Sequence, residues 1–100
     1  MEIIWSIQAR DDLKNIYNYS RTGTEKIVKK YILNLIEYTN SLSQNPFLGR
    51  VLFTHNNLEY HLLIYRKHKI IYTITNHINI VSVIHSSRNL EQVLSQIKFL

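Results

Sequence analysis

The chain has 100 residues, 45% of them hydrophobic, and carries 12 Lys and Arg against 7 Asp and Glu, for a formal net charge of +5 at pH 7. This length suits one ordinary domain, and the hydrophobic content with only 2 Gly and 1 Pro argues against a disordered or repetitive chain. The absence of Cys excludes disulfides, thiol catalysis and thiolate metal sites.

The N-terminal part predicts a strand followed by a helix. Residues 2–5 form a short extended run. Ser6 is a suitable helix N-cap, because its hydroxyl can accept a hydrogen bond from a free backbone N–H of the first turn. Apolar side chains then recur at spacings of three and four, which predicts a helix over residues 6–20 with one buried face. Residues 21–23 break this helix.

A second, longer helix is expected over residues 24–43. Thr24 can cap it, and an apolar stripe runs along one face with lysines opposite. The helix should end before Pro46, because the residue preceding a proline is pushed out of helical geometry, and Gly49 offers a turn. Two consecutive helices with a short link imply an antiparallel hairpin, which we expect to pack on one face of a sheet.

Three runs rich in β-branched and aromatic residues predict an antiparallel sheet. They cover residues 59–65, 69–75 and 79–84 and are separated by polar breaks of hairpin length. Residues 50–57 are expected to connect the hairpin to the sheet as a loop, with a short strand over 51–53 as the alternative.

A short amphipathic helix is predicted over residues 89–98, capped by Asn89. Its apolar stripe either completes the core of the domain or stays open for a partner. The sequence therefore predicts one α+β domain over residues 1–100, in the order β-α-α-β-β-β. An N-terminal helical hairpin packs on one face of a small, mainly antiparallel β-sheet, and the short C-terminal helix follows.

The positive charge is concentrated in the second half of the chain. Residues 50–88 carry Arg50, Arg66, Lys67, Lys69 and Arg88 against Glu59 alone, a net charge of +4. A localised cationic surface is typical of proteins with an anionic partner, such as nucleic acid or an acidic protein segment. The alternative is an ordinary solubilising surface.

Several classes of site are not expected. The five His lie on different predicted turns and strands without paired helical spacing, so neither a metal site nor a cofactor is predicted. No apolar run approaches the roughly 20 residues of a membrane helix, and the apolar run at the N-terminus is too short for a signal peptide. We therefore expect a cytoplasmic protein without membrane contact.

Two short motifs flank the predicted sheet, Asn45-Pro46-Phe47-Leu48-Gly49-Arg50 before it and His85-Ser86-Ser87-Arg88 at its end. In this order after two helices, they resemble the RelE/ParE superfamily of toxins from bacterial type II toxin–antitoxin systems, over nearly the whole chain. Further matching residues are Trp5, Ala9, Asp12, Leu13, Ile16, Tyr19 and the run His68-Lys69-Ile70-Ile71-Tyr72. The resemblance implies a toxin that inhibits bacterial growth, the activity by which such systems stabilise plasmids. It also implies a cognate antitoxin that binds the toxin in a hetero-oligomer and neutralises it.

The superfamily includes two mechanisms. RelE-like members are ribosome-dependent mRNA endoribonucleases that need no metal, and ParE-like members inhibit DNA gyrase. If this chain is a ribonuclease, the resemblance implies that Lys69, Arg88 and His85 are catalytic, because RNA cleavage needs a base, an acid and cations beside the phosphate. Lys69 replaces an Arg of those nucleases, and their C-terminal Tyr has no counterpart after Arg88.

The ParE-like pattern fits better, through Gly49-Arg50 and His85-x-x-Arg88, although His61 replaces an Arg that is often found in the first long strand. We therefore predict a gyrase inhibitor, with the ribonuclease and a non-toxic antitoxin-binding module as alternatives. The residues expected to contact the target or nucleic acid are Arg50, His61, Arg66, Lys67 and His68. Each also has a structural interpretation, as a solvated turn, a packed side chain or a loop anchor.

Overall fold

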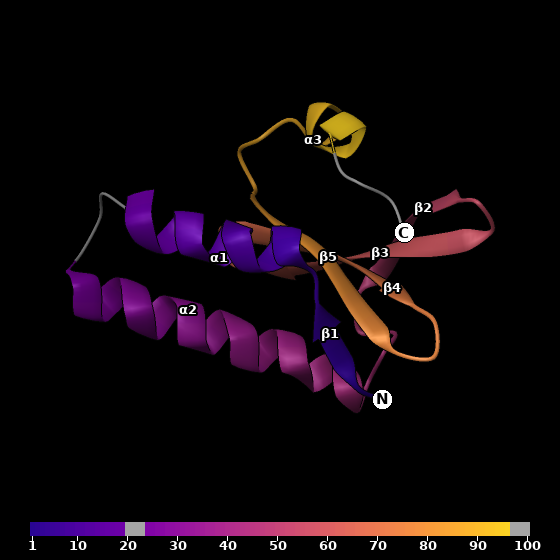
Figure 1. Ribbon diagram of the computed structural model, residues 1–100, viewed down its shortest axis with the longest axis horizontal. Coiled ribbons are helices and arrows are strands. Elements are labelled where there is room, and N and C mark those ends of the chain that lie inside the picture. The colour runs from indigo at the N-terminus through magenta and orange to yellow at the C-terminus, as the bar shows by residue number, and fades with distance from the viewer. Residues whose placement is uncertain (20–23, 97–100) are drawn as a thin grey trace.

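The computed structural model describes residues 1–19 and 24–96. The predicted helix break at residues 21–23, residue 20 of the first predicted helix and residues 97–98 of the last one lie outside the described residues. The elements, shown in Figure 1, are β1 (Ile3–Trp5), α1 (Ile7–Tyr19), α2 (Glu25–Asn40), the 3-10 helix η1 (Ser41–Ser43), β2 (Arg50–His55), β3 (Leu58–Tyr65), β4 (His68–Ile74), β5 (Ile78–His85) and α3 (Leu90–Gln96).

The helices begin at the residues whose side chains can cap them. Ser6 Oγ accepts a hydrogen bond from the Ala9 N–H at 3.0 Å, and Thr24 Oγ1 accepts one from the Ile27 N–H at 3.3 Å. The α-helical geometry of α2 ends at Asn40, and η1 takes up the remaining residues of the predicted second helix. In the part of the chain that the structure describes, no helix combines the length and the apolar character needed to cross a membrane.

Within the described residues, five strands form one sheet in the order β1-β5-β4-β3-β2. The neighbours from β2 to β5 pair antiparallel, whereas β1 pairs parallel with β5, with Ile3 opposite Ile78. Figure 1 shows α1 and α2 side by side, with α3 apart from them and joined to β5 by a loop. The predicted α+β fold, with a helical hairpin on one face of a mainly antiparallel sheet, is confirmed.

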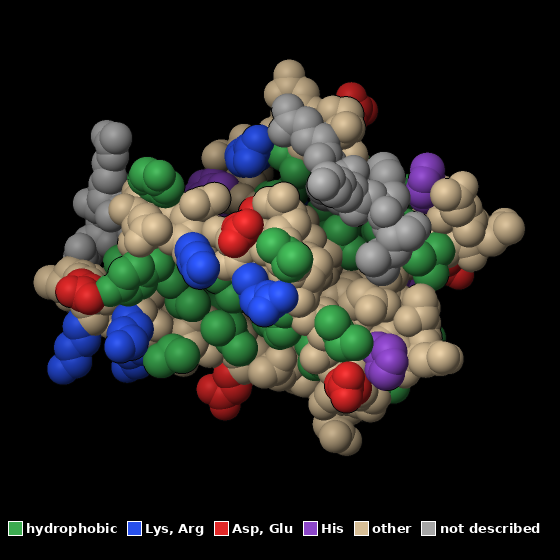
Figure 2. Space-filling view, in the orientation of Figure 1, with side chains coloured by type: hydrophobic (Ala, Val, Ile, Leu, Met, Phe, Trp, Pro, Cys, Tyr) green, Lys and Arg blue, Asp and Glu red, His purple; other side chains and the backbone are tan. Residues whose placement is uncertain are grey.

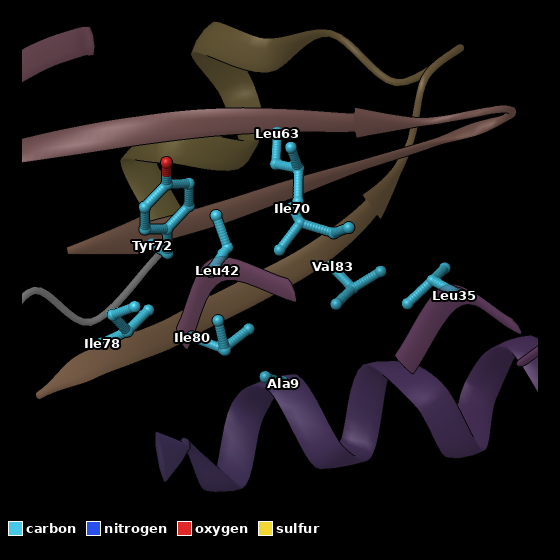
Figure 3. Close-up of a cluster of buried hydrophobic side chains, with 9 residues drawn as sticks. All are labelled: Ala9, Leu35, Leu42, Leu63, Ile70, Tyr72, Ile78, Ile80 and Val83. Carbon is cyan, nitrogen blue, oxygen red and sulfur yellow. The ribbon is translucent and has the colours of Figure 1, made fainter. Parts of the chain in front are cut away.

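The main core lies between the helical hairpin and the sheet, as Figure 3 shows. Leu35 of α2 is fully buried there against strand residues such as Ile70 and Val83. Each side chain of this size contributes roughly 1.5–3 kcal/mol when it is removed from water. The buried members are Ala9, Leu35, Leu42, Leu63, Ile70, Tyr72, Ile78, Ile80 and Val83.

The other face of the sheet carries a second buried cluster with α3. Asn89 caps this helix, because its Oδ1 accepts hydrogen bonds from the N–H groups of Glu91 and Gln92 at 2.9 and 3.3 Å. Val93 is 5% exposed and packs with strand residues. The apolar stripe of the C-terminal helix therefore completes the core of the domain. The buried members of this cluster are Tyr60, Leu62, Ile71, Val81, Ile84 and Val93.

The prediction of a loop over residues 50–57 is wrong, because most of this segment is strand β2. A register shift between Val51 and Phe53 breaks the simple alternation of buried and exposed side chains, which is the signal that a sequence pattern gives for a strand. Asn56 and Asn57 have φ angles of 52° and 62°, so they form the kind of two-residue turn that joins twisted antiparallel strands. The sheet therefore has one strand more than predicted.

The loop before β2 is fixed by one tyrosine hydroxyl. Tyr72 Oη donates to the Pro46 carbonyl at 2.8 Å and accepts from the Gly49 N–H at 3.0 Å. A Cβ at Gly49 would lie 2.5 Å from the Leu62 carbonyl oxygen, so no larger residue fits there without moving the backbone. These contacts set the position at which β2 begins.

Candidate functional site

An open cleft of about 680 Å³ lies between the helical hairpin and the ends of β4 and β5. It brings together Arg66, Lys67, His68, His85 and Arg88, which the sequence had indicated from separate segments. The walls contributed by α1 and α2 are Asp12, Asn15, Ile16, Tyr19, Ile27, Val28 and Tyr31.

The cationic side of the cleft is a tight turn between β3 and β4. Tyr65 pairs with His68, so Arg66 and Lys67 are the two central residues of the turn, and Arg66 has a φ of 50°. The Lys67 carbonyl accepts a hydrogen bond from the Ser86 N–H at 2.7 Å. The turn is therefore attached to the segment that follows β5.

Two histidines meet at the base of the cleft. His68 and His85 are register partners on β4 and β5, and their ring centroids lie 5.3 Å apart with an edge-to-face angle of 84°. His68 is buried, and Tyr31 Oη lies 2.7 Å from its Nδ1. Burial, with the positive charges of His85 and Lys67, lowers the pKa of His68 to about 4. The His68 ring is therefore neutral at pH 7.

Tyr31 of α2 packs against His68. Its hydroxyl oxygen lies 2.7 Å from His68 Nδ1, and the centroids of the two rings are 5.5 Å apart. Burial raises the pKa of Tyr31, and the Lys67 backbone acts in the opposite direction. Tyr31 therefore helps to hold the His68 ring in its buried position.

His85 is exposed, and its ring is held by the turn that follows β5. Its Nδ1 accepts the Ser87 N–H at 3.0 Å and lies 2.7 Å from Ser87 Oγ. The Arg88 N–H donates to the His85 carbonyl at 3.1 Å. His85 thus orients the segment that carries Arg88.

Asp12 on α1 lines the cleft and was not singled out as a site residue from the sequence. Strand β5 has a bulge at Val81. Ile80 and Ser82 on either side of it are the register partners of two consecutive residues of β4, so Val81 is an extra residue in the strand. Next to it, Asp12 Oδ2 accepts hydrogen bonds from Ser82 Oγ and the Val83 N–H, both at 2.8 Å. The carboxylate therefore ties α1 to the irregular part of the strand, a contact between residues 70 positions apart that no local sequence signal reveals.

Replacing Asp12 with Ala is expected to lower the free energy of unfolding by about 2 kcal/mol, because the buried Val83 N–H would lose its acceptor. Urea unfolding of the two proteins measures the difference. Asp11→Ala is the matched control, since Asp11 is an exposed neighbour on the same helix and should change stability by less than about 0.5 kcal/mol. Equal effects of the two substitutions would contradict this role of Asp12.

Lys69 lies on the other face of the sheet from the cleft. It is the register partner of Ile84, which packs in the cluster on the α3 side, whereas the preceding residue pairs with His85. Successive side chains of a strand point to opposite faces. Lys69, His85 and Arg88, the residues implied for RNA cleavage, therefore do not share one face of the sheet.

Arg50 and His61 do not line the cleft either. Arg50 is exposed at the start of the edge strand β2. His61 is 4% exposed and stacks on Tyr72, with ring centroids 5.1 Å apart. Burial lowers the pKa of His61, and within the described residues its Nδ1 has no hydrogen-bond partner.

Three cationic side chains line the cleft. Among the described residues, no acidic side chain forms an ion pair with Arg66, Lys67 or Arg88. Figure 2 shows a different pattern over α1 and α2, where basic and acidic side chains alternate with hydrophobic ones. Over residues 1–19 and 24–96, no group of three or more His, Asp or Glu side chains is arranged to hold a metal ion.

Comparison with known proteins identifies a family. The family model described as "ParE toxin of type II toxin-antitoxin system, parDE" matches residues 3–90. Among solved structures, a chain described as "Chromosomal ParDE TA system from P. aeruginosa" has a similar fold, with a TM-score of 0.69 and 18% identity over 85% of this chain and 95% of that chain. No curated protein sequence matches this chain.

Proposed function

Because the chain belongs to the ParE toxin family of type II toxin–antitoxin systems, we propose that it arrests bacterial growth by inhibiting DNA gyrase. The observation that carries the proposal is the family match over residues 3–90, which includes both helices of the hairpin, the whole sheet and the cleft. The toxin acts in the cytoplasm, where its target is found, and direct binding of a cognate antitoxin neutralises it.

The arrangement of the basic residues supports gyrase as the target over messenger RNA. Catalysis of RNA cleavage needs its acid, base and cations within reach of one phosphate. Lys69 is separated from His85 and Arg88 by the sheet. The cationic turn with Arg66 and Lys67, by contrast, is an exposed surface that suits contact with a large target.

Purified protein is expected to inhibit DNA supercoiling by gyrase, and the double substitution Arg66→Ala with Lys67→Ala should lower its potency about tenfold. The matched control is Lys29→Ala with Lys30→Ala, which removes the same charge from an exposed part of α2 that does not line the cleft. Circular dichroism checks that all three proteins are folded.

A translating extract with transcript mapping is the second arm of this experiment. Cleavage of transcripts with gyrase unaffected would replace the proposal with the ribonuclease. If neither activity appears and induction in a host without the antitoxin is harmless, the protein is a non-toxic antitoxin-binding module. Equal loss of potency in the two double variants would show that the cleft is not the contact surface.

A further inference from the structure

The cleft contains positive charge that the protein itself does not neutralise. Arg66, Lys67 and Arg88 line it without an ion pair among the described residues. Asp12 is the acidic residue among the lining residues, and its Oδ2 already accepts hydrogen bonds from Ser82 Oγ and the Val83 N–H. A concave surface with this imbalance concentrates anions.

A backbone hydrogen bond joins the two segments that carry the cationic residues. The Ser86 N–H donates a hydrogen bond to the Lys67 carbonyl oxygen, with an N···O distance of 2.7 Å. This bond joins the turn that bears Arg66 to the segment that bears Arg88. An arginine on each side of such a junction suits a phosphate, because guanidinium groups bind its oxygens in pairs. His85 adds a donor, since its Nδ1 accepts the Ser87 N–H, which leaves Nε2 as the ring nitrogen that carries a proton.

An exposed aromatic side chain stands on the opposite wall of the cleft. Tyr19, at the end of α1, lines the cleft and is 75% exposed. Exposed rings beside cationic groups are typical of sites that stack nucleobases. The cleft volume of about 680 Å³ lies within the range of roughly 300–1,000 Å³ for sites that hold small molecules. The volume therefore suits one nucleotide unit.

We propose that this cleft is a binding site for a nucleoside phosphate, with the phosphate on Arg66, Lys67 and Arg88 and the base against Tyr19. The ligand is a free nucleotide or one unit of a single-stranded nucleic acid, which share this chemistry. The site is a further property of the chain and does not depend on gyrase inhibition.

Calorimetric titration of the full chain tests the proposal with defined probes. AMP should bind more tightly than either inorganic phosphate or adenosine, because only AMP engages both walls of the cleft. A single-stranded hexanucleotide of deoxyadenosine distinguishes the two sources: tighter binding than AMP indicates a strand, and equal binding indicates a free nucleotide. A hexaglutamate peptide is the anionic control.

Two substitutions separate the walls of the site. Arg88→Ala should weaken AMP binding about tenfold, whereas Arg10→Ala, which removes an exposed arginine of α1 outside the cleft, should leave it unchanged. Tyr19→Ala should weaken AMP binding by a similar factor without changing phosphate binding, and Tyr19→Phe should restore it because the ring is kept.

Four results would overturn the proposal: no AMP binding at millimolar concentration, equal loss with Arg10→Ala and Arg88→Ala, no loss with Tyr19→Ala, or binding of hexaglutamate as tight as that of the hexanucleotide. The last would assign the cleft to an acidic peptide. The titration contains no gyrase. Its result can therefore be interpreted even if the protein does not inhibit gyrase.

Discussion

Replacing Leu35 with Ala is expected to lower the free energy of unfolding by about 2–5 kcal/mol, the range observed when a buried leucine is truncated and leaves a cavity. Leu35 is fully buried between α2 and the sheet, in contact with a cluster that includes Ala9 and Val83. Neither neighbour can move to fill the space, because one is anchored in α1 and the other in β5. Since small domains are stable by only about 5–15 kcal/mol, this loss is a large fraction of the total.

Leu33→Ala is the matched control for this prediction. Leu33 lies on the same helix but is 58% exposed, so its truncation removes little buried surface, and the effect on unfolding should stay within about 0.5 kcal/mol. Urea or thermal unfolding, monitored by circular dichroism, measures both variants. Similar losses for Leu33 and Leu35 would show that α2 is not packed on the sheet as described.

The fold could be predicted from the sequence wherever a pattern repeats over several turns or strand residues. The helical stripes and the runs of β-branched and aromatic residues in β3, β4 and β5 are of this kind, and they predicted the α+β architecture. Strand β2 was missed because it is only six residues long and has polar residues at both ends, so it does not form a long run of β-branched and aromatic residues; it also contains a register shift near Val51. The turn at Asn56 and Asn57 was a usable signal, since Asn tolerates positive φ better than most residues.

The candidate site was predictable only in part. Cationic residues and His85 were recognised because their chemistry is evident in the sequence, and the pairing of β4 with β5 brings His85 together with His68. Tyr31 was not named as a site residue from the sequence, although its hydroxyl forms a hydrogen bond with His68. Lys69 was grouped with its neighbours along the chain, but alternation along β4 places it on the other face of the sheet. Such contacts depend on register, which sequence patterns do not determine.

The stability of the protein is expected to fall as the pH decreases from about 6.5 to about 4, with His68 as a main cause. In the unfolded chain His68 takes up a proton near its ordinary pKa of 6.5, whereas in the folded protein its pKa is lowered to about 4. The stabilising effect is therefore complete above pH 6.5 and is lost as the pH falls towards 4. Because one pKa unit corresponds to about 1.4 kcal/mol, the loss amounts to at most about 3 kcal/mol.

The groups packed around His68 explain why its proton is disfavoured. Burial has the largest effect on the pKa of His68, and the electrostatic effects of the neighbouring His85 and Lys67 act in the same direction. Tyr31 Oη encloses the ring from the helix side, 2.7 Å from His68 Nδ1. Replacing His68 with Asn should flatten the dependence, because Asn does not titrate. The pH dependence of stability that remains in this variant is due in part to His61, because burial also lowers the pKa of His61.

Urea unfolding at pH 7.5 and pH 4.5, at one ionic strength, gives the pH difference in stability for each protein. Comparing the difference within each protein makes the result independent of any general destabilisation by His68→Asn. NMR titration of the imidazole in the unmodified protein provides a direct check, with the His68 resonance expected to titrate near pH 4. An unchanged pH difference in the variant, or titration of His68 near 6.5, would show that burial and its charged neighbours do not keep this ring neutral.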